Sequence, residues 1–162
     1  MKTFYTLLIV CGLFFTSHAQ ESLAPINFND NSIQSNNIYV QELSDLLNGS
    51  FHTLIFTDHI SSLHEEAGTV KRIQLVNTNS LSLLNSNPTM INYNDVEVLE
   101  FNYANGNVFN APSGLNSLFP NLKYIYISSY DLIDESSITT ALNQVINQFS
   151  DVKVIYQILE NR

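Results

Sequence analysis

The sequence is poor in cysteine, tryptophan and basic residues: it has one cysteine, no tryptophan, and six lysine and arginine residues against fifteen acidic ones. Cys11 lies in an apolar run near the amino terminus, so the rest of the chain has no thiol for a disulfide, a nucleophile or a thiolate metal site. The formal net charge of −9 opposes binding to phosphate backbones and anionic lipid heads. We therefore expect no nucleic-acid partner, and a fold that is stabilised by packing.

The sequence also lacks the common motifs of catalysis and metal binding. Its five glycines never cluster into a phosphate-binding loop, and neither a G-x-S-x-G elbow nor an HExxH motif is present. The one histidine cluster, DHISSLHEE, places His59 and His64 five residues apart, about 140° around a helix, so the two rings would not converge on one ion. We expect no catalytic residue, no metal and no cofactor.

The first twenty residues, MKTFYTLLIVCGLFFTSHAQ, have the pattern of a bacterial secretory signal peptide. Lys2 precedes an apolar run from Phe4 to Phe15, and Ser17-His18-Ala19 fits the small-x-small rule for cleavage after Ala19. The run is shorter than the roughly 20 residues of a membrane-spanning helix. Cys11 is a poor lipid-attachment site, because Val10 before it is not small. The pattern predicts a secreted or periplasmic protein that is not inserted in a membrane once the signal is removed.

The remainder of the chain divides into a lead-in and one domain. Residues 20–37 are polar and have no periodicity, which indicates a linker or an irregular lead-in segment. Residues 38–162 have the length of a single domain with a core. The domain is predicted to begin with a helix whose apolar face consists of Val40, Leu43, Leu46 and Leu47, and which ends at Asn48-Gly49.

Six-residue segments that are apolar at the first, fourth and sixth positions recur in the rest of the domain. The frame fits five segments: FHTLIF from Phe51, VKRIQL from Val70, VEVLEF from Val96, LKYIYI from Leu122 and VKVIYQ from Val152. The last copy departs from the frame, because Gln157 stands at its sixth position. Internal repetition at about 20–30 residues predicts parallel strands, each of which buries its apolar face by stacking on the next unit.

Three connections between these segments have helical patterns: residues 60–67, 114–119 and 136–149. The last has an apolar stripe at helical spacing, with Ser136 or Ser137 as the predicted N-cap. Parallel strands that alternate with such crossovers predict an α/β fold.

The five frames, and above all PSGLNSLFPNLKYIYIS, resemble the leucine-rich repeat family. In this stretch a Leu115/Leu118 helical turn and Pro120-Asn121 precede the strand frame that begins at Leu122. The resemblance covers about residues 51–160 and implies a solenoid of about five parallel strands. The turn asparagine of the family is missing from its expected place, and the spacing is uneven, so the resemblance is to a short, degenerate member.

A compact doubly wound α/β domain is the alternative architecture. A sheet covered on both faces has near-continuous apolar strands, whereas VKRIQL has polar side chains at its second, third and fifth positions and VEVLEF has them at its second and fifth. These polar positions favour a sheet with one open face. In the alternative, a small enzyme or ligand-binding domain would have its site at the carboxyl ends of the strands, near residues 57–58, 77–79 and 102–105.

The third and fifth positions of the frames define a predicted binding face. If the first, fourth and sixth positions point inward, these positions point outward, and aromatic rings with isolated charges are typical of recognition surfaces. We therefore predict a non-enzymatic binding protein for a protein or a glycan. The candidate binding residues are Tyr124, Tyr126, Tyr156, Arg72, Gln74 and Glu100. The competing interpretation is that the three rings pack against a covering segment.

Overall fold

A computed structural model describes most of the chain after the predicted signal peptide. The residues described are 24–29, 37–49, 52–56, 60–63, 69–77, 80–84 and 92–160. The predicted signal peptide, His59, His64 and residues 57–58 and 78–79 lie outside them.

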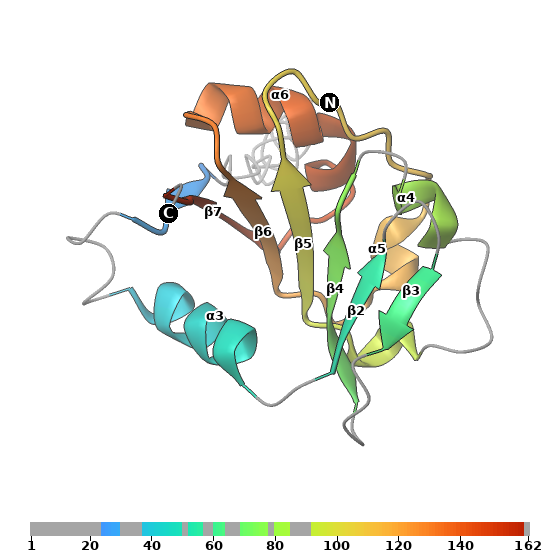
Figure 1. Cartoon of the computed structure of the whole chain (residues 1–162). Helices are drawn as coiled ribbons and strands as arrows, with labels where there is room; N and C mark the ends of the chain where they lie inside the picture. Colours follow the sequence, from blue (N-terminus) through green and yellow to red (C-terminus); the bar gives the residue numbers. More distant parts are fainter. Residues whose placement is uncertain are drawn as a thin grey trace, which may run out of the picture.

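The described residues form an α/β fold around one sheet of seven strands (Figure 1). The strands are β1 (Ile26–Asn27), β2 (His52–Phe56), β3 (Ile60–Leu63), β4 (Val70–Leu75), β5 (Val98–Tyr103), β6 (Tyr124–Ser129) and β7 (Lys153–Ile158). Their order across the sheet is β1-β7-β6-β5-β4-β2-β3. All neighbours except β2 and β3 pair in parallel, so six strands run in one direction and β3 is antiparallel to β2. The five predicted strands are confirmed, and β2, β4, β5, β6 and β7 lie side by side in chain order.

The larger core lies on the sheet face that carries the fourth and sixth positions of the frames. Ile73, Leu99 and Ile125 are neighbours on adjacent strands, and all three are fully buried. The segments that cover this face are α4 (Ser80–Leu83), the 3-10 turn η2 (Tyr93–Asp95), α5 (Leu115–Leu118) and α6 (Glu135–Ile146). Alternation in the strands therefore produces one continuous apolar face, which the crossovers cover.

The sequence of helix α6 accounts for its buried face and for the residue at which it begins. Ile138, Leu142 and Val145 recur at helical spacing and are buried against the sheet. The observed N-cap is Asp134, whose side chain accepts a hydrogen bond of 2.7 Å from the backbone N–H of Ser137. The helix confirms the prediction for this segment, whereas the predicted caps at Ser136 and Ser137 were wrong by two or three residues.

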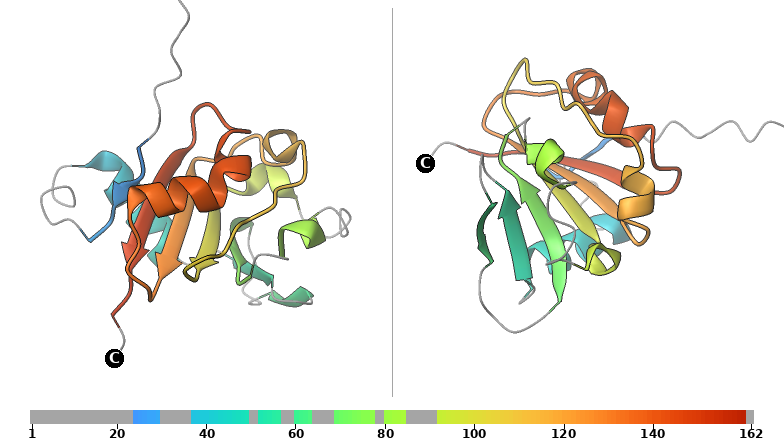
Figure 2. Two further views of the ribbon diagram at one scale, coloured as in Figure 1. Left: turned by 90° about the horizontal axis from the view of Figure 1, so that it is seen from above. Right: turned by 90° about the vertical axis from the view of Figure 1, so that its right-hand side faces the viewer.

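Helix α3 (Ile38–Asn48) lies on the opposite face of the sheet. Figure 2 shows α6 and α3 on the two sides of the strands. Three of the four residues predicted for the apolar face of α3, Val40, Leu43 and Leu46, are buried, and Leu47 is partly buried. This face packs on Val98 and Tyr124. The second face of the sheet is therefore covered over β5, β6 and β7.

Two segments differ from their predicted structure. Residues 60–67 were predicted to be helical, but Ile60–Leu63 is strand β3, which pairs with β2. Residues 20–37 were predicted to be a linker or irregular, yet Ile26–Asn27 pairs with β7 and extends the sheet. Neither segment has the alternation that identifies a strand in the sequence, because a short strand at a sheet edge needs only backbone hydrogen bonds to form.

The register of β7 also differs from the prediction. Tyr124 pairs with Lys153 and Ile127 with Tyr156, so the last repeat is displaced by one residue relative to its frame. Because side chains alternate, this displacement places Val154 and Tyr156 in the larger core and Ile155 on the α3 face. The physical reason is Gln157, which the predicted register would have buried in the larger core.

Candidate functional site

On the α3 face of the sheet, the described residues line a hollow at each end of the strands. One has a volume of about 770 Å³ and lies at the carboxyl ends of β4 to β7, beside the last turn of α3; we call it the carboxyl-end cleft. The other, of about 910 Å³, lies at the amino ends and is called the amino-end cavity. The part of α3 that packs on Val98 and Tyr124 lies between them. Over β5, β6 and β7, the helix therefore separates the two hollows.

Two cross-strand rows of polar side chains form the floor of the carboxyl-end cleft. In the first row Gln74, Glu100 and Tyr126 are paired across β4, β5 and β6. The second row is one step nearer the carboxyl ends and consists of Asn102, Ser128 and Gln157 on β5, β6 and β7. Since the side-chain period of a strand is two, residues two apart point to the same face and the rows are adjacent.

Glu100 of the first row forms a largely buried ion pair with Arg72, which lies two residues before Gln74 on β4. Arg72 Nε lies 2.8 Å from Glu100 Oε2, and the side chains are 19% and 6% exposed. Glu100 Oε1 also accepts a hydrogen bond of 3.1 Å from Gln74 Nε2, and Arg72 Nη1 donates one of 3.1 Å to the carbonyl of Leu47 near the end of α3. Burial raises the pKa of the Glu100 carboxyl, and the neighbouring guanidinium opposes this rise. The ion pair therefore adds no net charge to the floor of the cleft, and the hydrogen bond from Arg72 to Leu47 links the floor to α3.

The second row is a network of carboxamides and hydroxyls. Asn102 Oδ1 accepts hydrogen bonds from Ser128 Oγ at 3.0 Å and from Gln74 Nε2 at 3.3 Å. Gln157 Oε1 accepts a hydrogen bond from the phenol of Tyr126. In both carboxamides the oxygen is therefore held by the protein, and the NH₂ group is the end that remains for other contacts.

Aromatic and aliphatic side chains form the walls of the cleft. Phe28, which follows β1, contacts Tyr126 edge to face, with the ring centroids 6.3 Å apart. Tyr130, in the loop after β6, is 63% exposed, and Val76 after β4 is 37% exposed. These side chains line the same cleft as the polar floor. The site thus combines a hydrogen-bonding floor with apolar walls, which is the usual composition of a ligand site.

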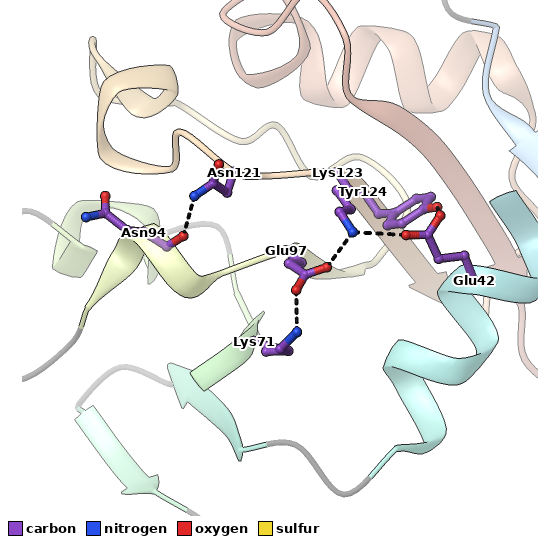
Figure 3. A network of polar contacts seen from close by, with 7 residues as sticks. All are labelled: Glu42, Lys71, Asn94, Glu97, Asn121, Lys123 and Tyr124. Carbon is purple, nitrogen blue, oxygen red and sulfur yellow. Dashed lines mark hydrogen bonds and ion pairs between the residues drawn. The ribbon is translucent and has the colours of Figure 1, made fainter. Parts of the chain in front are cut away.

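The amino-end cavity holds a chain of alternating charges. Backbone hydrogen bonds of 2.9 Å each align Lys71, Glu97, Lys123 and Lys153 on neighbouring strands. Figure 3 shows Glu97 between Lys71 and Lys123, and Lys123 between Glu97 and Glu42 of α3. Lys123 Nζ lies 2.8 Å from Glu97 Oε2 and 3.0 Å from Glu42 Oε1. The chain of charges attaches the middle of α3 to the sheet.

The titration of these groups follows from their contacts. Burial acts to raise the pKa of Glu97, but hydrogen bonds from Lys123 and Lys71 bring it below its ordinary value. The Tyr124 phenol donates a hydrogen bond of 2.6 Å to Glu42 Oε2, and this bond, followed by that from Lys123, lowers the pKa of Glu42. Hydrogen bonds to Glu97 and Glu42 raise the pKa of Lys123. These contacts therefore favour the charged forms of Glu97, Glu42 and Lys123.

The structure separates the predicted binding residues into three groups. Arg72, Gln74, Glu100 and Tyr126 lie together in the carboxyl-end cleft. Tyr124 is 2% exposed and lies beneath α3, and Tyr156 is 7% exposed and lies in the larger core on the opposite face of the sheet. The prediction that the three tyrosines form one exposed face was wrong. The competing interpretation holds for Tyr124 and Tyr126, which α3 covers, and the register of β7 turns Tyr156 to the opposite face.

Signals in the sequence are weaker for the other residues of the cleft. Asn102 falls within the loop range 102–105 of the alternative architecture, and Ser128 and Tyr130 are not among the predicted residues. The signal for Gln157 is that it breaks the repeat. A polar residue just after the sixth position, as at Asn102 and Ser128, marks the place where the apolar covering of the strand ends.

The described residues also bear on whether the chain has a membrane span or a metal site. No helix in this part of the chain is both long enough and apolar enough to cross a membrane. Within the same residues, no three histidine, cysteine, aspartate or glutamate side chains are grouped so that they could hold a metal ion.

Comparison with known proteins identifies no relative: no family model matches the chain, and no curated protein or solved structure is similar to it. The resemblance to the leucine-rich repeat family stays a prediction from the sequence.

Proposed function

We propose that the protein is a secreted or periplasmic, non-enzymatic binding protein that recognises a glycan in the carboxyl-end cleft. The observation that carries the proposal is the chemistry of the floor, in which carboxamides and hydroxyls surround one internally paired charge couple. Hydroxyl-rich ligands are bound by donors and acceptors at close spacing, and this floor supplies them. The aromatic walls add apolar surface for the C–H faces of sugar rings.

The fold that we propose for this function is a short leucine-rich-repeat-like solenoid. Its support is the strand order, in which β2, β4, β5, β6 and β7 follow one another across the sheet without a change of direction. A doubly wound sheet reverses direction at a switch point. Three features depart from a regular solenoid, namely β1, which pairs with β7, β3, which is antiparallel to β2, and α3, which covers part of the second face.

The alternative function, a small enzyme, is favoured by one observation. Glu100 is a buried carboxylate with a raised pKa at the floor of a cleft, and such groups act as acids or bases in many active sites. Glycoside hydrolysis, however, commonly uses two carboxylates on either side of the bond. Among the described residues that line the cleft, Glu100 is the one carboxylate, which supports binding over hydrolysis.

The test of the proposal uses two variants of one loop. Tyr130→Ala removes the exposed ring at the cleft, and Leu132→Ala removes a side chain that is 89% exposed two residues later and is not among the residues that line the cleft. Both variants should keep the unfolding midpoint of the wild type, because both side chains are exposed.

The proteins are applied to an array of neutral and acidic glycans, and affinities are measured by calorimetry. We expect the wild type and Leu132→Ala to bind the same neutral glycan, and Tyr130→Ala to bind it at least tenfold more weakly. An array on which no glycan is bound, or equal binding by the two variants, would contradict the proposal; release of shortened glycan would instead favour the enzyme.

A further inference from the structure

The free hydrogen-bonding groups of the cleft define its ligand more narrowly. The carboxamide oxygens of Asn102 and Gln157 accept hydrogen bonds from neighbouring side chains, as described above. Their NH₂ groups have no acceptor in the part of the chain that the structure describes, and both residues line the cleft. The rotation of each amide is therefore fixed by the protein, and its donor end is directed to whatever occupies the cleft.

The side chain of Gln74 supplies the complementary group. Its Nε2 donates to Glu100 Oε1 and Asn102 Oδ1, so its oxygen is the end without a bond among the described residues. The floor thus offers two NH₂ donors and one carbonyl acceptor. A ligand amide presents the complement, because its C=O accepts and its N–H donates.

The surroundings select against an anionic ligand. Glu100 lies in the neighbouring row and its one nearby cation, Arg72, is already engaged by it and by the carbonyl of Leu47. A carboxylate or sulfate would find no free cation among the described residues of the cleft to balance its charge. Phe28 and Leu159 give the same cleft apolar surface that suits a methyl group.

We infer that the ligand is an oligosaccharide of N-acetylated amino sugars, and that Asn102 and Gln157 determine this specificity by donating to acetamido carbonyls. The inference rests on the proposed function and deepens it. Asn102 is on β5 and Gln157 on β7, with β6 between them. Neighbouring strands are about 4.8 Å apart, so the two donors start from backbones roughly 10 Å apart and suit a ligand of more than one sugar.

The experiment compares two ligands that differ in the acetamido group. The probes are the β-1,4-linked tetramers of N-acetylglucosamine and of glucose, and affinities are measured by calorimetry. We expect the wild type to bind the N-acetylglucosamine tetramer at least tenfold more tightly than the glucose tetramer.

The variants Asn102→Asp and Gln157→Glu keep the oxygens that accept the internal hydrogen bonds and remove the NH₂ donors. Each should weaken binding of the N-acetylglucosamine tetramer about tenfold, the effect of one lost hydrogen bond to the ligand, and reduce the preference between the tetramers. The matched control is Asn143→Asp, the same change of group on the exposed side of α6. Circular dichroism and urea midpoints confirm that each variant is folded.

The possible results separate the two proposals. Equal affinity for both tetramers overturns the inference and leaves a glycan site in place. Binding of neither tetramer, while another glycan on the array is bound in a manner that depends on Tyr130, also overturns the inference alone. If no glycan is bound at all, both proposals fail.

Discussion

Truncation of Tyr126 tests whether the α3 face of the sheet is covered. The ring is 5% exposed, contacts Phe28 edge to face and belongs to the apolar cluster between α3 and the sheet. Tyr126→Ser removes the ring from this cluster, and loss of a buried aromatic ring costs about 3–5 kcal/mol of unfolding free energy. Tyr126→Phe keeps the ring and removes only the hydrogen bond to Gln157, at a cost of about 1 kcal/mol.

Urea denaturation measures both effects. With an m-value of about 2 kcal/mol/M, the Ser variant should shift the unfolding midpoint by about 2 M and the Phe variant by about 0.5 M. The difference between the variants reports the burial of the ring, separately from its hydroxyl. A midpoint for Tyr126→Ser within about 0.3 M of the wild type would show that the ring is exposed in solution, and would refute the placement of α3.

Further predictions concern the packing of α3, the Arg72–Glu100 ion pair and the Glu97–Lys123 ion pair. Leu43→Ala should cost about 2–5 kcal/mol in urea melts, because Leu43 is fully buried between α3 and the sheet; a loss near zero would mean that the helix does not pack there. Arg72→Met should lower the unfolding free energy by about 3–5 kcal/mol at pH 7, because it leaves the Glu100 carboxylate buried and unpaired. This loss of stability should shrink as the pH falls toward the raised pKa of Glu100, and a loss independent of pH would contradict the pairing. The pKa of Glu97 is lower in the folded than in the unfolded protein, so the carboxylate contributes stability above its unfolded-state pKa, and this stability is lost as the pH falls through the folded-state pKa. The unfolding free energy measured from pH 6 to pH 2 should therefore fall less steeply in Lys123→Met than in the wild type. Parallel curves would argue against the chain of charges.

The strands were predictable because their signal is local. Apolar residues at the fourth and sixth positions repeat in four segments, and burial of one face requires that alternation wherever a crossover covers it. The helices at residues 38–48 and 135–146 were predictable for the same reason, since their stripes have a period of 3.6.

The covering of the tyrosines was not predictable, because it depends on where α3 lies rather than on whether it forms. The apolar face of α3 is visible in the sequence, but an amphipathic helix packs equally well on either face of a sheet that offers apolar side chains. The outward positions Val98, Tyr124 and Tyr126 were predicted to lie on a recognition surface. Their apolar character instead indicates that another segment of the chain, α3, packs on them.

The candidate site was partly predictable. Arg72, Gln74 and Glu100 stood out as polar positions within strands, and they do line the cleft. The contribution of Gln157 depends on the one-residue displacement of β7, which a single polar residue in the frame could indicate but not prove. The hydrogen bonds that orient the two carboxamides link side chains on different strands, so they follow from the register and not from the sequence pattern.

Recognition of the ligand in the carboxyl-end cleft is tested by following the side-chain NH₂ signals of the asparagines and glutamines by ¹⁵N NMR during addition of the N-acetylglucosamine tetramer. We expect saturable shifts of the NH₂ signals of Asn102 and Gln157, with those of Asn121 at the amino-end cavity and Asn143 on α6 unchanged. Shifts at Asn121 that leave Asn102 and Gln157 unmoved would place the site at the other end of the sheet. The absence of any shift at millimolar tetramer would contradict recognition of this ligand in the carboxyl-end cleft.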